Sequence, residues 1–276
     1  MERAEVSFLK ESKEQMPREI QRLELDPENG IDIVIKTAPG IELSKELKDI
    51  GGYEPVQIVL QCEGKDVLNF NEFLPKDYKF AFPGIDIQKQ KIDKELSGDT
   101  FYNDPAEKLL IIPRKWNEGP KDILGLLHEI GHSLDKKLPQ KIKQVRHWDD
   151  IINEMEKIES ETGEIPEMGI KWAEEEFAKQ LKLYSRMERF AWAKALTIVR
   201  KLKKKGIKLL KPFQGETADE TKRNLEKYIH GITSLGYAEK WDVIGSPFAE
   251  EFKGIFTTKI YRGEKFTPEH RKKIRG

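Results

Sequence analysis

The segment GPKDILGLLHEIGHSLD, residues 119–135, constrains the fold of this chain most strongly. Its apolar residues recur three and four positions apart, which is helical spacing: Ile123, Leu126, Leu127, Ile130 and Leu134. Pro120 suits the first turn of a helix, and Asp122 favours its positive N-terminal end. The preceding run KLLIIP, residues 108–113, is continuously apolar and is typical of a short strand. The sequence therefore predicts a strand followed by an amphipathic helix.

Two histidines lie on this helix, four residues apart. His128 and His132 leave the same face one turn apart, so their imidazoles can bind one metal ion. Glu129 is then beside the metal, where its carboxylate can take a proton from a bound water and pass it to a leaving amine. A zinc ion lowers the pKa of such a water towards ~7. Gly131, between the two histidines, leaves room for close packing against a neighbouring strand.

The alternative interpretation is an ordinary amphipathic helix whose histidines belong to the core or the surface. The chain has 5 histidines, and the motif uses two of them. Their spacing, on a helix that follows a strand, favours the metal site over the alternative.

The long helical pattern of residues 169–205 contains a candidate for a further metal ligand. One stripe along it places a single charged residue, Glu188, among uncharged ones: Ala173, Phe177, Leu181, Tyr184, Ala191, Ala195 and Ile198. A carboxylate buried among apolar side chains is costly unless it is paired or bound to a cation. Glu188 is therefore the predicted third ligand, and the alternative is a salt bridge to Arg186, Arg189 or Lys194.

Other side chains are further candidates for roles at such a site. The candidate ligands are Glu174, Glu175, Glu176, Glu250, Glu251 and His147, while Asp135 is interpreted as a cap or as a partner of a histidine. The candidates for a donor to a developing oxyanion are Tyr184, Tyr228 and His230. The single cysteine, Cys62, excludes an internal disulfide and a cysteine-based zinc cluster, and it is predicted to be a buried free thiol.

The remaining pattern predicts an α+β fold. Strands are expected at residues 31–36, 56–62 and 79–88, the last with a break at Pro83 and Gly84. Helices are expected at 41–50, 147–164, 169–205 and 217–235, with an interruption near Ser185 and a C-terminal cap at Gly206. We expect a mixed α+β N-terminal region of unknown role over residues 1–100, and a mainly helical domain with a small sheet over residues 101–276.

The ten residues LLHEIGHSLD resemble the active-site helix of the zincin metallopeptidases, especially the gluzincin-like branch, whose third ligand is a glutamate. The resemblance covers roughly residues 101–200 and is specific over those ten residues. It implies a zincin-like catalytic domain in which His128, His132 and Glu188 bind zinc and Glu129 is the general base. It also implies that an edge strand, here KLLIIP, binds an extended peptide substrate by backbone hydrogen bonds.

The sequence departs from two patterns of these families. Asp135 and Leu138 stand where the longer HExxHxxGxxH motif has Gly and its third His, which disfavours the metzincin branch. Trp192 stands four residues after Glu188, where gluzincin-like proteins carry an Asp that supports a ligating histidine.

Charge and hydropathy restrict the partners. Lys and Arg together number 49, and so do Asp and Glu, so no strong global field points to nucleic acid or to an anionic membrane. The first fifteen residues lack an apolar signal core, and no run approaches the roughly 18 apolar residues of a spanning helix. We expect a cytoplasmic protein with a peptide or protein substrate and no membrane association. Nucleic acid is disfavoured as a partner, and the sequence carries no signal for an oligomeric state.

The leading hypothesis is a zinc-dependent peptidase that hydrolyses peptide bonds with metal-activated water and Glu129 as general base. An alternative is a regulatory or binding protein that keeps a zincin scaffold but has little general protease activity. It predicts bound zinc without hydrolysis of unstructured peptides, and tight binding to one protein or to DNA. A third hypothesis is a metal-free helical protein.

Overall fold

The computed structural model describes residues 16–39, 41, 53–83, 101–116, 119–146, 148–163 and 167–241. Within these ranges the protein combines a mixed sheet with several helices, so the predicted α+β class is confirmed. Apart from residue 41, the helix predicted at residues 41–50 lies outside the described residues, as does residue 147 at the start of the predicted acidic helix.

The sheet has seven strands in the order β1-β2-β3-β5-β7-β6, and β4 also pairs with β3. The strands are β1 Glu19–Asp26, β2 Ile31–Thr37, β3 Tyr53–Cys62, β4 Lys65–Asn69, β5 Lys79–Pro83, β6 Tyr102–Asp104 and β7 Leu109–Ile111. All pairs are antiparallel except β5 with β7. Because β5 pairs with β7, one sheet spans the boundary expected at residue 100. The described part of the N-terminal region therefore belongs to the same fold as the helix that carries the HEIGH motif, residues 128–132 (the HEIGH helix).

Three of the predicted strands are confirmed, at 31–36, 56–62 and 108–113, and the described part of the fourth forms β5. The expected position of KLLIIP at the sheet edge is wrong. Its strand β7 lies between β5 and β6, and β6 is the last strand of the described order. The reason is that the chain before β7 folds back on it as an antiparallel hairpin, so β6 takes the outer place.

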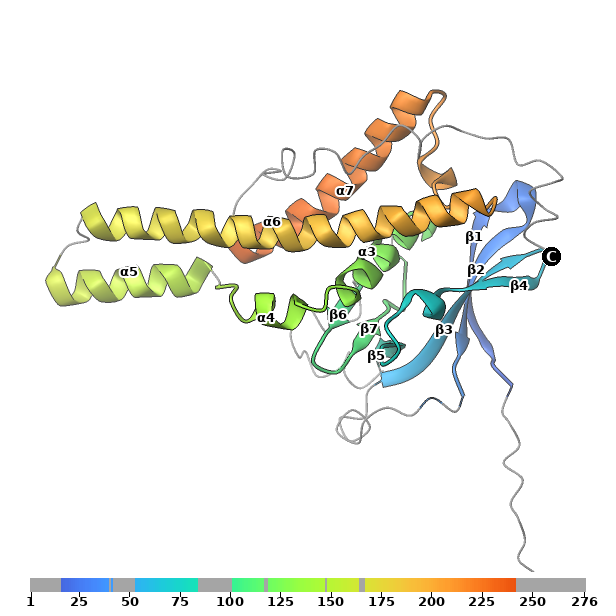
Figure 1. Ribbon diagram of the computed structural model, residues 1–276, viewed down its shortest axis with the longest axis horizontal. Helices are drawn as coiled ribbons and strands as arrows, with labels where there is room; N and C mark the ends of the chain where they lie inside the picture. The colour runs from blue at the N-terminus through green and yellow to red at the C-terminus, as the bar shows by residue number, and fades with distance from the viewer. Residues whose placement is uncertain are drawn as a thin grey trace, which may run out of the picture.

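The helices come mostly from the second half of the chain (Figure 1). They are α3 Ile123–Ser133, α4 Leu138–Ile142, α5 Trp148–Thr162, α6 Glu167–Lys204 and α7 Ala218–Trp241, with short 3-10 turns η1 Pro27–Asn29, η2 Phe70–Phe73, η4 Gly119–Asp122 and η5 Lys211–Phe213. The predicted helices around the HEIGH motif, at 147–164, at 169–205 and at 217–235, are confirmed within these bounds.

Helix α6 is continuous for 38 residues, so the interruption expected near Ser185 is wrong. The Ser185 hydroxyl donates to the carbonyl of Leu181 at 2.7 Å, which lets a small polar residue remain inside the helix. The predicted cap at Gly206 is confirmed, with φ +88°. The amides of Gly206 and Ile207 donate back to the carbonyls of Lys203 and Leu202, which satisfies two terminal acceptors of the helix.

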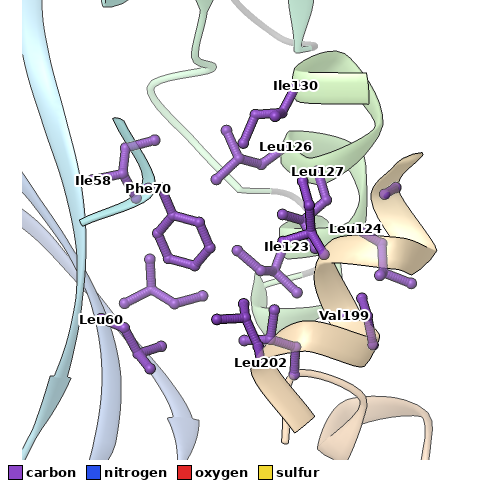
Figure 2. Packing of buried hydrophobic residues seen from close by; sticks show 14 of the residues in the cluster. Ile58, Leu60, Phe70, Ile123, Leu124, Leu126, Leu127, Ile130, Val199 and Leu202 are labelled. Carbon is purple, nitrogen blue, oxygen red and sulfur yellow. The ribbon is translucent and has the colours of Figure 1, made fainter. Parts of the chain in front are cut away.

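Alternating residues of β2 and β3 form one wall of the core. Ile33 pairs with Leu60 and Ile35 pairs with Ile58, and all four side chains are buried on the same face. Figure 2 shows the next layer, in which α3 presents Leu126 and Ile130 towards the sheet. Helix α6 lies against α3 through residues such as Val199 and Leu202, so the HEIGH helix is held between the sheet and α6.

Helix α5 packs against α6, and α7 contacts α6 through the hydrogen bond between Trp192 and Thr233. Helix α5 and the first part of α6 extend together beyond the sheet, while α7 crosses near the middle of α6 (Figure 1). In the described ranges, no helix is both long enough and apolar enough to span a membrane.

The Ile130→Ala substitution tests this arrangement. Ile130 is fully buried between α3 and the sheet, so the truncation should lower the free energy of unfolding by about 2–5 kcal/mol. The control is Ile170→Ala, which removes the same atoms from a side chain that is 47% exposed and should change stability by less than about 1 kcal/mol. Urea unfolding measures both values, and equal losses would contradict the described core.

Candidate metal centre

Helix α3 places both histidines of the HEIGH motif on one buried face. His128 and His132 are each less than a tenth exposed, and their Nε2 atoms lie 3.0 Å apart. Both rings therefore direct the same nitrogen to the same point, as the four-residue spacing predicts. This convergence is the first requirement of a two-histidine metal site.

Glu188 reaches the same point from α6. Its Oε2 atom lies 3.0 Å from Nε2 of His128, and its Oε1 atom lies 3.4 Å from Nε2 of His132. In a tetrahedral zinc site with bonds of about 2.0–2.1 Å, neighbouring ligand atoms are separated by roughly 3.3 Å. The three side chains are therefore spaced as ligands of one ion would be.

The predicted alternative for Glu188 is not found. Among the described residues, its carboxylate pairs with the two histidines and not with Arg186, Arg189 or Lys194. Lys194 instead lies over the ring of Phe190, at 5.1 Å from its centroid.

The charge of Glu188 depends on its two neighbours. Burial raises the pKa of this carboxyl group, but the imidazoles of His132 and His128 lower it more, so the pKa lies well below its usual range. The contacts with the two imidazoles thus stabilise the charged form of the buried carboxylate.

Glu129 lies beside this group. Its Oε1 atom is 4.0 Å from Nε2 of His128, and the ligand atoms of His128, Glu129 and His132 all lie within 4.8 Å of one another. Glu129 is therefore an alternative third ligand by distance alone. Glu188 lies closer to His128 and contacts both rings, so it is the better ligand. The Glu129 side chain is also the more exposed of the two, at 16% against 8% for Glu188.

The site depends on close contact between α3 and α6. A Cβ atom built on Gly131 would lie 2.2 Å from the carbonyl oxygen of Ala191 and 2.8 Å from its Cα atom. Glycine is therefore required at this point of α3. The predicted need for a small residue is confirmed, but the expected neighbour is wrong, because α6 and not a strand makes the contact.

Trp192 contributes a contact that sequence reasoning left without a role. Its indole stacks on the imidazole of His128, with ring centroids 4.2 Å apart and planes inclined by 32°. Its Nε1–H donates to the hydroxyl of Thr233 on α7 at 3.0 Å. The spacing of the two residues could have indicated this contact. Trp192 follows Glu188 by four residues, so both side chains lie on the same face of α6.

The other candidate ligands take different roles or lie outside the described residues. Asp135 accepts from the amide of Lys137 at 3.0 Å and pairs with Lys141, so it stabilises the turn before α4, whose N-cap residue is Lys137. Glu176 accepts from Lys179 and Gln180. Glu174 and Glu175 are exposed on α6, and the remaining candidates lie outside the described residues: His147, Glu250 and Glu251.

Three other candidates lie in the core or at its border. The Tyr228 hydroxyl donates to Asp122 at 3.3 Å, which joins α7 to the turn before α3. Tyr184 is buried one turn before Glu188, within the main core cluster. His230 is half-buried on α7, where desolvation lowers its pKa. Cys62 is a buried free thiol in the core, as predicted.

Comparisons of the chain with protein-family models, with curated proteins and with solved structures found no match. The assignment of the site therefore depends on the residues and their geometry.

The Gly131→Ala substitution tests the contact between α3 and α6. The added methyl group collides with the backbone of Ala191, so the two helices must separate, and stability should fall by about 1–3 kcal/mol. Gly231→Ala is the matched control, because Gly231 is a helical glycine on α7 with no atom within 4 Å of the added carbon. Thermal unfolding of both variants measures the difference. A Gly131→Ala protein as stable as the control would refute the close approach.

Proposed function

We propose that this chain is a zinc-dependent peptidase of the gluzincin-like type. The observation that carries the proposal is the convergence of His128, His132 and Glu188 within 3.0–3.4 Å of one another, from two helices that are packed without a gap. Two imidazoles and a carboxylate with an open fourth position are a ligand set that suits zinc. The donors fit the ion in chemistry and in spacing.

A zinc ion held by these three side chains would supply a water of lowered pKa and would polarise the scissile carbonyl. The carboxylate of Glu129, next to His128, would take the proton released by the attacking water. It would then pass this proton to the nitrogen of the leaving amine, so that it acts first as base and then as acid. Glu188 and the two histidines contribute binding and orientation.

The sheet offers a place for an extended substrate. In the described sheet, β6 is the outermost strand after β7, and α3 contacts both strands. An outermost strand can bind an extended peptide by backbone hydrogen bonds. In this proposal residues Tyr102–Asp104, and not KLLIIP, bind the extended peptide through their backbone. Their strand lies beside α3.

The Glu188→Ala substitution tests the ligand set. Purified wild-type protein should contain about one zinc per chain, and the variant should contain well under half of that after dialysis, because one of three protein ligands is lost. Glu175→Ala is the control, since Glu175 is exposed on the same helix and should leave the zinc content unchanged. Elemental analysis measures all three proteins. Full zinc in Glu188→Ala would transfer the ligand role to another residue.

The Glu129→Gln substitution tests the general base. The amide keeps the shape of the side chain but cannot accept the proton, so peptide hydrolysis should fall by at least about 10²–10⁴-fold while zinc content stays the same. Glu175→Gln provides the matched control. Unchanged hydrolysis in Glu129→Gln would refute the mechanism. A wild-type protein with bound zinc that cleaves no unstructured peptide would favour the regulatory alternative.

A further inference from the structure

The ring face of His128 packs against an aromatic side chain. Trp192 is fully buried, and its indole lies against the imidazole at a centroid distance of 4.2 Å. Glu188 precedes Trp192 by one turn of α6 and bonds to the same imidazole at Nε2. The same helix therefore holds His128 at two places, at its ligating nitrogen and over its ring face.

The other ring nitrogen of His128 has no hydrogen-bond partner among the described residues. Binding of a metal at Nε2 requires the lone pair there, so the proton of the neutral ring is on Nδ1. Ligating histidines commonly donate this second N–H to a carboxylate or a carbonyl, which fixes the ring plane. In the described structure that orientation has to come from packing, and the packed group is the indole of Trp192.

The orientation of Trp192 is itself fixed from α7. Its Nε1–H donates to Oγ1 of Thr233 at 3.0 Å, and the same hydroxyl donates to the carbonyl of Ile229 at 2.8 Å. The Thr233 hydroxyl thus has its proton committed to its own helix and its lone pair directed at the indole. A continuous series of contacts runs from α7 through Trp192 to His128.

We propose that Trp192 is a positioning residue for the metal site and that Thr233 on α7 controls it. The indole fixes the plane of His128 by stacking, and the hydrogen bond to Thr233 fixes the plane of the indole. The inference rests on the proposed zinc site. An imidazole that donates electron density to a cation becomes electron-poor, and the electron-rich face of an indole attracts it. Docking of α7 and binding of zinc are therefore coupled.

Thermodynamic coupling acts in both directions. Zinc should protect the amides of α7 near Ile229 and Thr233 from hydrogen exchange, and loss of the Thr233 hydroxyl should weaken zinc binding. The side chains that carry the effect do not touch the metal. A purely structural role for Thr233 predicts lower stability but the same zinc affinity in the folded protein.

The decisive variant is Thr233→Val, which removes the hydroxyl and keeps the side-chain volume. Zinc affinity is measured on the full chain by competition with a chromophoric chelator, at a temperature where circular dichroism shows each protein folded. We expect Thr233→Val to bind zinc about 10-fold more weakly, within the range known for residues that support a ligand. Thr233→Ser keeps the hydroxyl and should bind within about twofold of the wild-type protein.

Thr197→Val is the matched control. Thr197 lies on α6, and its hydroxyl also donates to a backbone carbonyl four residues earlier, but it is exposed and is not the acceptor of the Trp192 N–H. Its zinc affinity should equal that of the wild type. Trp192→Phe keeps an aromatic ring but loses the N–H, and it should weaken zinc binding in the same direction as Thr233→Val.

Two spectroscopic measurements complete the test. The visible absorption bands of bound Co²⁺ should shift in Thr233→Val and return in Thr233→Ser, because they report ligand geometry. Zinc-dependent protection of the α7 amides should be present in the wild type and reduced in Thr233→Val.

Each outcome decides the proposal. Unchanged zinc affinity and unchanged Co²⁺ bands in Thr233→Val, or in Trp192→Phe if the first variant does not fold, overturn it. A wild-type protein that binds no zinc overturns both this inference and the proposed function. A wild-type protein that binds zinc with the expected dependence on Thr233, but hydrolyses no peptide, supports the inference and refutes the peptidase.

Discussion

The contact between Gly131 and the backbone of Ala191 sets the distance between α3 and α6, and the remaining geometry depends on it. A short carboxylate side chain on one helix can reach two imidazoles on another only when the helix axes are close. The sheet holds α3 from the opposite side through Leu126 and Ile130, so α3 cannot retreat to admit a larger residue. The position of Glu188 relative to the histidines is thus a consequence of core packing, not of the site residues alone.

The sequence predicted the features that local periodicity encodes. The spacing of the apolar residues indicated α3, and the four-residue step brought His128 and His132 to one face. Glu188 was predicted because a single carboxylate interrupted an uncharged stripe, and burial of a lone charge is costly. The short strands followed from their β-branched residues, and Gly206 followed from the needs of a helix end.

The predictions that were wrong or missing concern contacts between segments that are distant in the sequence. The apolar run KLLIIP does not reveal which strand lies on each side of it, because strand order is decided by pairing across the whole sheet. Gly131 indicated a close approach but not whether a helix or a strand makes it. The role of Trp192 depends on Thr233, 41 residues further along the chain, and no local pattern connects the two.

The length of α6 determines how the site can come apart. Helix α6 runs from Glu167 to Lys204, so Glu188 is 21 residues after its start and 16 before its end. Helices fray within about one turn of each end, which leaves roughly three turns or more of intact helix on both sides of this carboxylate. Fraying of either end of α6 therefore does not move the Glu188 carboxylate. Separating it from the histidines requires α3 and α6 to move apart. Fraying at either end of α6 would therefore leave a bound metal ion in place, whereas separation of α3 from α6 would remove one of its ligands.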